Sequence, residues 1–134
     1  MKINKIVIHC SDTPNGRPHT AEDIHSWHLE RGWDGIGYHH VIDVDGKIEN
    51  GRPNYWVGSH VAGHNHDSLG ICLIGKDDFT EDQYKSLEFL IVGLMGKYAD
   101  TEVVGHYELD SKKTCPNFDV KAWWVEKKKN HTWG

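Results

Sequence analysis

The stretch Lys5-Ile6-Val7-Ile8-His9 decides the fold, because it is a short, continuous run of apolar and β-branched residues. Such a run is typical of a strand buried on both faces of a sheet. Residues 69–74 have the same character, and residues 102–105 predict a further short strand. Strands covered on both faces need helices above and below them, so the pattern favours an α/β domain.

Capping signals predict three helices around these strands. Thr20, Thr80 and Asp119 are good N-cap residues, and each precedes an amphipathic pattern. Asp45-Gly46 separates two alternating segments and predicts a β-hairpin between the first helix and the second long strand. The elements follow one another without a linker, so residues 1–134 are expected to form one domain with a mixed central sheet.

The composition excludes several classes of protein. With 15 basic and 20 acidic residues the net charge is −5, whereas a nucleic-acid-binding domain usually carries a basic face. No apolar run approaches the roughly 18 residues of a membrane span, and the apolar run 6–8 is too short for a signal peptide. We therefore expect synthesis in a cytoplasm, no membrane insertion and no nucleic-acid partner. Three cysteines in a reducing compartment indicate thiols or metal ligands rather than disulfides.

Three residues have the chemistry of transition-metal ligands. His9 ends the first strand, His106 follows the last strand, and Cys115 lies nine residues later beside Pro116. Two imidazoles and one thiolate leave a fourth position open, which is the pattern of catalytic zinc. The alternative is that both histidines are ordinary core or surface residues and that Cys115 is a small buried side chain. Cys10 directly follows His9 in a strand, so the two side chains point to opposite faces and do not share one metal.

Seven short segments resemble, in order, the motifs of one known family. The family is the zinc-dependent N-acetylmuramoyl-L-alanine amidases of the type-2 class, which include the amidase-type lysozymes of T-odd coliphages and, more distantly, the peptidoglycan recognition proteins. The matching segments are residues 6–11 (IVIHCS), 27–33 (WHLERGW), 36–42 (IGYHHVI), 57–60 (VGSH), 65–71 (NHDSLGI), 105–108 (GHYE) and 113–119 (KTCPNFD).

The resemblance implies a fold and a metal site. The implied fold is a central, mostly parallel sheet of about five strands flanked by helices, with residues 1–134 forming a single catalytic domain. It makes His9, His106 and Cys115 the ligands of one Zn²⁺ per chain. A bound zinc ion lowers the pKa of its water towards ~7 and polarises a carbonyl, so it is suited to amide hydrolysis.

Four further residues match functional positions of the family. Tyr38 and Lys113 match positions that assist catalysis. Lys113 is two residues from Cys115, so in an extended loop both side chains point to the same side, where a cation would stabilise an oxyanion. The alternatives are a solvated loop lysine and a core tyrosine. His60 matches a histidine of the substrate cleft, and Asn65 a peptide-contacting position.

Other histidines compete for a place in the cleft. His39 and His40 alternate along a predicted strand, so only one of them faces the cleft, and His40 shares a face with Tyr38. His64 and His66 lie in a loop rich in glycine, asparagine and histidine, and either could touch the substrate.

The resemblance implies a phage endolysin that cleaves the amide between the lactyl group of N-acetylmuramic acid and L-alanine in peptidoglycan. A monomer is expected, which reaches the cell wall only after a separate lesion opens the membrane. Two alternatives are a non-catalytic peptidoglycan-binding module, in which the cysteine ligand is typically missing, and a cysteine hydrolase that uses Cys115. Some phage relatives also inhibit an RNA polymerase through a surface near the N-terminus. A first strand that starts near Lys5 gives that partner no support.

Overall fold

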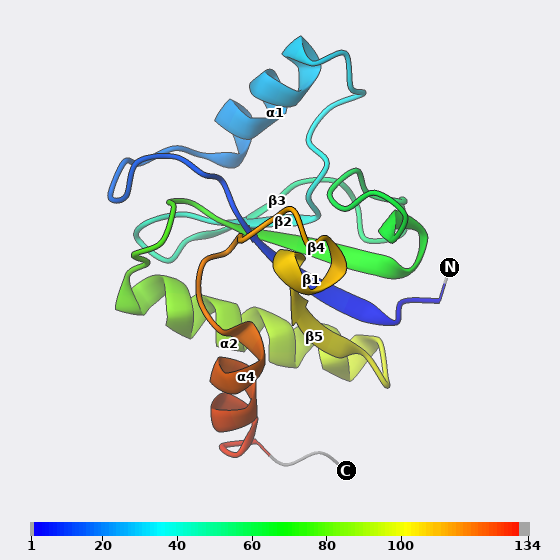
Figure 1. Ribbon diagram of the computed structural model, residues 1–134, viewed down its shortest axis with the longest axis vertical. Coiled ribbons are helices and arrows are strands. Elements are labelled where there is room, and N and C mark those ends of the chain that lie inside the picture. The colour runs from blue at the N-terminus through cyan, green and yellow to red at the C-terminus, as the bar shows by residue number, and fades with distance from the viewer. Residues whose placement is uncertain (1, 132–134) are drawn as a thin grey trace.

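A five-stranded sheet forms the centre of the computed structural model, which describes residues 2–131 (Figure 1). The strands lie in the order β3-β2-β4-β1-β5. β1 pairs in parallel with β4 and β5, β2 pairs in parallel with β4, and β2 pairs antiparallel with β3. The expected mixed, mostly parallel sheet is therefore confirmed. The bounds are β1 Lys5–Cys10, β2 His40–Ile42, β3 Ile48–Asn50, β4 Ser68–Leu73 and β5 Glu102–Gly105.

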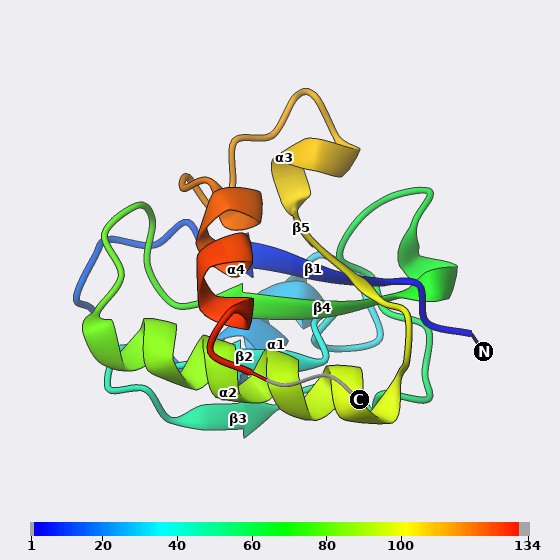
Figure 2. The same ribbon diagram turned by 90° about the horizontal axis from the view of Figure 1, so that it is seen from below.

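Helices cover both faces of this sheet. α1 lies alone on one face, and α2 and α4 lie together on the other (Figures 1 and 2). A short helix, α3, begins directly after β5, and a single 3₁₀ turn, η1, precedes β4. No helix among residues 2–131 has both the length and the apolar character to cross a membrane. The bounds are α1 Ala21–Glu30, η1 Asn65–Asp67, α2 Glu81–Lys97, α3 His106–Leu109 and α4 Val120–Lys128.

The alternation of side chains along β1 divides the interior into two parts. Ile6 and Ile8 pack with α2 and α4 in the main hydrophobic core. Val7 and His9 point to the other face, where α1 covers mainly the β2–β4 side of the sheet through a smaller cluster around Ile24. Because α1 leaves the β1–β5 side of that face open, a polar side chain at position 9 lies next to a cleft.

The predicted helix caps are present. The Thr20 side chain accepts a hydrogen bond from the Asp23 amide, and the Thr80 side chain accepts one from the Gln83 amide, each within a complete capping box. The Asp119 carboxylate accepts a hydrogen bond from Ala122 N. The sequence did not predict α3 or η1, because helices this short have no periodicity to detect.

Gln83 ties α2 to the carboxyl ends of two central strands. Its side chain is only 1% exposed, and its Nε2 donates to Ile42 O at 3.2 Å and Ile74 O at 2.8 Å. Replacing it with leucine takes the Gln83 donor from Ile74 O and removes the capping bond that Gln83 Oε1 accepts from Thr80 N, while Ile42 O keeps a bond from Ile74 N. We expect Gln83→Leu to lower the free energy of unfolding by about 2–4 kcal/mol in urea denaturation. The exposed Lys85→Ala on the same helix is the control, and an equal change in both variants would contradict the role of Gln83.

Candidate metal centre and cleft

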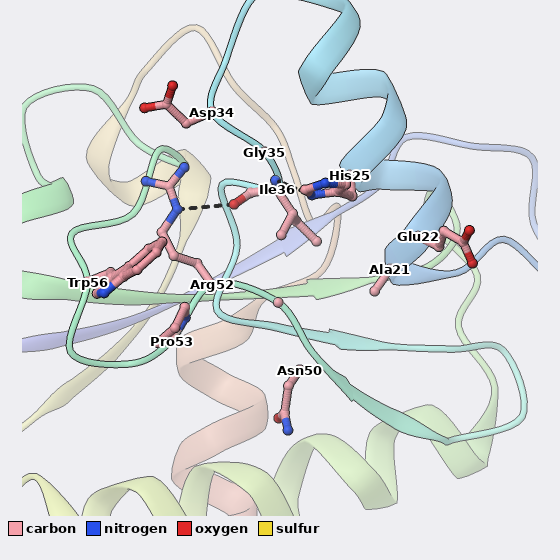
Figure 3. A pocket seen from close by; sticks show the side chains of 11 residues that line it. Ala21, Glu22, His25, Asp34, Gly35, Ile36, Asn50, Arg52, Pro53 and Trp56 are labelled. Carbon is pink, nitrogen blue, oxygen red and sulfur yellow. Dashed lines mark hydrogen bonds between the residues drawn. The ribbon is translucent and has the colours of Figure 1, made fainter.

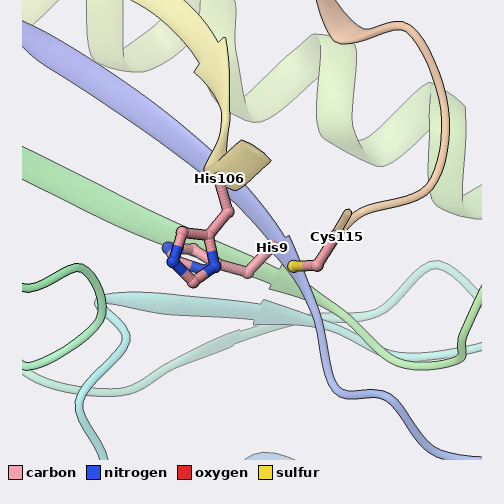
Figure 4. Close-up of side chains that lie close together, drawn as sticks. All are labelled: His9, His106 and Cys115. Atoms are coloured by element: carbon pink, nitrogen blue, oxygen red, sulfur yellow. The ribbon is translucent and has the colours of Figure 1, made fainter. Parts of the chain in front are cut away.

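Three potential metal ligands from separate parts of the chain meet at one end of the sheet (Figure 4). One ligand atom each from His9, His106 and Cys115 lies within 4.8 Å of the other two. The two histidine Nδ1 atoms are 3.1 Å apart. His9 is buried, whereas His106 and Cys115 are half-buried and reach the surface of the cleft. This is the only group of three or more potential ligands found among residues 2–131.

Strand register and two hydrogen bonds position the three ligands. Ile8 of β1 pairs with Gly105 of β5, so His9 and His106 both follow the same parallel pair and lie side by side. The Cys115 sulfur accepts a hydrogen bond from the Cys10 amide at 3.1 Å. The Cys115 carbonyl accepts a second one from Tyr107 N, also at 3.1 Å. The loop ligand is therefore fixed to both the β1 end and α3.

A chain of hydrogen bonds sets the tautomer of His9. Ser68 Oγ donates to His64 O at 2.7 Å, so it accepts from His60 Nε2 at 3.2 Å. With its proton on Nε2, His60 accepts through Nδ1 from His9 Nε2 at 2.8 Å. His9 Nδ1 therefore carries a lone pair, which points towards His106 Nδ1. Such outer partners fix the orientation of a metal-binding imidazole and raise its basicity.

A glycine in β4 makes room for this series of hydrogen bonds. A Cβ atom at position 70 would lie 2.6 Å from the His60 ring, closer than real Cβ contacts. Gly70 N also donates to His39 Nδ1, and the second ring nitrogen of His39 bonds to Trp56 O at 2.8 Å. Both buried imidazoles are therefore packed directly against the backbone of β4.

The electrostatic environment keeps the imidazoles neutral and the thiol protonated. Burial, together with the nearby His60 and His106, holds the pKa of His9 well below its usual value. Burial also lowers the pKa of His60 to about 3. A hydrogen bond with the Cys10 thiol and burial both raise the pKa of the Cys115 thiol.

The residues present fit a zinc ion. Two neutral imidazoles and a thiol form a donor set that zinc binds, and a cation beside Cys115 would offset the raised pKa of that thiol. A tetrahedral ion ~2.0–2.1 Å from each nitrogen would hold the two nitrogens about 3.3 Å apart, close to the separation seen here. With three ligands from the chain, a zinc ion would keep a fourth position for water or substrate.

Two adjoining hollows meet at the metal centre. One has a volume of about 580 Å³ and extends past Trp33 and Asn65. The other, of about 300 Å³, extends past Ser11 and Asn117. A substrate with two arms would place its reacting bond where the hollows join. The residues common to both are Arg31, Tyr38, His106 and Lys113.

The structure places both predicted catalytic residues at this junction. The Tyr38 ring centroid lies 5.0 Å from that of His9, and burial raises the pKa of Tyr38 well above its usual value. Tyr38 is therefore a hydrogen-bond donor at neutral pH. Lys113 is exposed and lines both hollows. Lys113 and Cys115 both line the smaller hollow.

The predicted substrate residues also line the larger hollow. His60 is 9% exposed, and both of its ring nitrogens already have partners, His9 and Ser68. Asn65 Oδ1 accepts from the amides of His60 and Val61, both at 2.9 Å, which leaves its NH₂ group without a partner among residues 2–131.

The four further histidines considered for the cleft do not line it, whereas His28 does. His40 does not line either hollow, and its Nε2 bonds to Asn54 Oδ1 at 2.9 Å. The expected alternation fails because the regular strand starts only at His40, so Tyr38 and His40 do not belong to one pleat. His64 and His66 are likewise absent from the lining of both hollows.

Sequence reasoning did not identify Arg31 and Trp33 as part of the cleft. The Arg31 guanidinium carbon lies 5.6 Å from the centroid of the Trp33 ring, a cation–π geometry. Both residues belong to the WHLERGW segment, so the motif itself was the available signal.

Comparisons with known proteins agree with this site. The sequence profile of the N-acetylmuramoyl-L-alanine amidase family matches residues 1–118. The chain is 42% identical over 127 residues to the endolysin of Escherichia phage T7, which covers 89% of this chain and 83% of that protein. It is 39% identical to the endolysin of Klebsiella phage KP32, over 92% of this chain and 86% of that protein. The chain therefore belongs to the N-acetylmuramoyl-L-alanine amidase family.

Comparison with solved structures leads to the same family. The amidase LysC from Clostridium intestinale superposes with a TM-score of 0.84 at 36% identity, covering 96% of this chain and 85% of that one. Drosophila PGRP-LB superposes with a TM-score of 0.78 at 28% identity, covering 95% of this chain and 80% of that one. The predicted family, fold and amidase activity are confirmed, and the chain is an amidase of the endolysin type.

The hydrogen-bond chain behind His9 generates a test. Ser68→Ala removes the group that fixes the His60 tautomer but leaves all three predicted ligands in place. We expect zinc affinity, measured by competition with a chromophoric chelator, to fall by about 10-fold. Ser26→Ala, on the exposed side of α1, is the matched control. Equal zinc affinity in both variants would show that the hydrogen bonds through Ser68 and His60 do not support the predicted metal ligands.

Proposed function

We propose that His9, His106 and Cys115 hold one Zn²⁺ ion, and that the chain uses it to hydrolyse the amide between the lactyl group of N-acetylmuramic acid and L-alanine. The observation that carries the proposal is the convergence of two imidazoles and a thiol where the two hollows meet. The substrate is branched at this bond, with a sugar on one side and a peptide on the other. Each hollow would take one arm.

When bound, zinc supplies an activated water and polarises the scissile carbonyl. The residues of the chain then have separate tasks. His9 presents its Nδ1 lone pair because His60 accepts the proton of its other ring nitrogen. Tyr38, held protonated by burial, donates a hydrogen bond to the attacking water or to the developing oxyanion. Lys113 provides a positive charge beside that oxyanion.

Substrate contacts are assigned to His60 and Asn65. Asn65 is suited to donate to a peptide carbonyl, because its Oδ1 is engaged by the backbone and its NH₂ group is not. His60 lines the larger hollow, but its two nitrogens bond to His9 and Ser68. We therefore assign His60 a positioning role towards His9 in addition to ring contact with the substrate.

In its biological setting the chain acts on bacterial peptidoglycan as a monomeric single-domain endolysin, residues 1–134. It is made in the host cytoplasm and acts on the wall once the membrane has been opened. Relatives named endolysin come from phages, and a solved PGRP-LB variant of similar fold is bound to tracheal cytotoxin. The endolysin relatives support a substrate in the bacterial wall.

The direct test measures zinc content beside hydrolysis of purified peptidoglycan, before chelation, after chelation and after zinc is returned. We expect about one zinc per chain, loss of hydrolysis on chelation and recovery with zinc. The melting temperature should fall on chelation, because a ligand that binds only the folded state stabilises it. Full hydrolysis by protein shown to be free of metal would reject the proposed mechanism.

Two variants distinguish a residue that holds zinc from a residue that only assists the reaction. Cys115→Ala should lose both zinc and hydrolysis, because two histidines alone hold the metal poorly. Lys113→Ala should keep zinc and melting temperature but lose about 10²–10³ in kcat, because a charge that stabilises the oxyanion is removed. KM should change much less, since the substrate amide is neutral. Lys113→Ala with wild-type kcat would make Lys113 a plain surface lysine.

Tyr38→Phe tests the hydroxyl alone. The ring still fills its buried site beside His9, so zinc content should match the wild type. We expect kcat to fall by about 10-fold or more, because a donor aimed at the water or the oxyanion is lost. Zinc analysis and initial rates on the same samples check this. A variant that loses zinc together with rate would instead place Tyr38 among the supports of the metal centre.

A further inference from the structure

A third hollow lies beside α1 at Ala21, Glu22 and His25 (Figure 3). Its volume is about 410 Å³, within the range typical of small-molecule sites. It shares no lining residue with the two hollows of the cleft. One wall comes from α1, a second from residues 34–36, and a third from the loop that follows β3 (Figure 3).

An exposed aromatic side chain forms one side of this hollow. Trp56 is 57% exposed, and the neighbouring Tyr55 is 78% exposed. The loop that carries Trp56 is nevertheless held firmly. Trp56 O accepts a hydrogen bond from His39 Nε2 at 2.8 Å, and Val57 O accepts one from Arg52 Nη1 at 2.7 Å. The indole is therefore presented to solvent by a fixed backbone, which is a feature of binding surfaces rather than of loose loops.

Both acidic and basic side chains face the hollow beside Trp56. Arg52 Nε donates to Ile36 O at 3.1 Å, which orients the rest of its guanidinium. Asp34 is exposed on the same side and makes no ion pair with Arg52, so the Asp34 carboxylate and the Arg52 Nη2 group, which is not engaged by Ile36 O or Val57 O, can both face a ligand (Figure 3). His25 Nδ1 accepts from Ile36 N at 3.0 Å, which leaves its Nε2 proton free to donate.

The aromatic and polar side chains around this hollow determine which kind of ligand fits it. An indole face stacks on the apolar C–H face of a sugar ring, while a carboxylate, a guanidinium and an imidazole donor satisfy its hydroxyl and acetamido groups. Glu22 and Asp34 would repel a phosphate or an acidic peptide. An uncharged, hydroxyl-rich ring fits best.

We propose that the hollow beside Trp56 binds N-acetylated amino-sugar units of the peptidoglycan strand, as a second glycan site separate from the metal centre. This inference rests on the proposed function, which supplies a polymer that is long enough to occupy both places. Binding at Trp56 would raise the local concentration of stem peptides at the metal centre.

The two sites are neighbours across one backbone contact. Ser59 N donates to Gly37 O at 3.0 Å, and a side chain at Gly37 would collide with the Ser59 carbonyl. Trp33 and Tyr38 lie on the cleft side of this contact, and residues 34–36 lie on the other side. A glycan strand that crosses the hydrogen bond between Ser59 and Gly37 would pass from the hollow beside Trp56 to the cleft.

The binding test uses N-acetylglucosamine tetramer, which has no lactyl amide and no peptide. Titration of the zinc-loaded protein, followed by amide and indole NMR signals, should shift Trp56 and residues 34–36. Trp56→Ala should weaken tetramer binding about 10-fold or more. Phe89→Ala, which removes an aromatic side chain that is 75% exposed on α2, is the matched control and should bind as the wild type does.

Three results of the binding test would overturn the inference. One is a tetramer that shifts only residues of the cleft. Another is equal tetramer affinity in Trp56→Ala and Phe89→Ala. The third is a sugar-free stem peptide that binds at Trp56 in place of the tetramer. Asp34→Ala provides a second variant at an exposed position, should Trp56→Ala have a lowered melting temperature.

The kinetic test separates this inference from the proposed function. Trp56→Ala should hydrolyse insoluble peptidoglycan about fivefold more slowly at limiting substrate, whereas its rate on a soluble monosaccharide–peptide amide should change by less than about twofold. Equal loss on both substrates would overturn the second site. A wild-type protein that cleaves neither substrate but binds the tetramer at Trp56 would reject the proposed function and leave the glycan site standing.

Discussion

The parallel pairing of β1 with β5 is the constraint on which the metal centre depends. It sets Ile8 opposite Gly105, and the residue after each is a histidine. A shift of one residue in this register would turn the alternating β1 side chains over and send His9 into the apolar core against α2. The register is in turn fixed by burial, because Ile6 and Ile8 must face that core. Packing on one face of the sheet therefore controls chemistry on the other.

Buried imidazoles connect the irregular segment between β3 and β4 to the sheet. His39 joins the β4 backbone at Gly70 to the loop at Trp56, and His60 joins His9 to Ser68. Each ring has both nitrogens engaged, which satisfies polar groups that would otherwise be costly to bury. These histidines account for part of the high histidine content. The His39 ring bonds to backbone groups and the His60 ring bonds to two side chains.

Much of the fold was predictable from local sequence, because its signals are local. Thr20, Thr80 and Asp119 cap their helices as expected, and the buried strands lie where continuous apolar runs predict them. The proximity of His9, His106 and Cys115 was predictable because the two histidines lie at strand ends, where parallel strands bring their termini together. The hydrogen bond between His60 and Ser68, by contrast, could not be predicted, because no spacing in the sequence encodes it. The place of His40 was mispredicted because alternation holds only inside a regular strand.

The position of α1 between two hollows has a consequence for how this surface can change. Glu22 and His25 line the hollow beside Trp56, whereas His28 and Arg31, the residue after the helix, line the cleft. These residues follow one another at intervals of three, so neighbouring members of the series contact one another along the helix surface. His25 accepts a hydrogen bond from Ile36 N and His28 accepts one from Gly37 N, so both rings hold the same backbone segment and substitutions at the two positions should be coupled. A single ten-residue helix thus links the walls of the two hollows, so a change on one side should be felt on the other through residues 36–37.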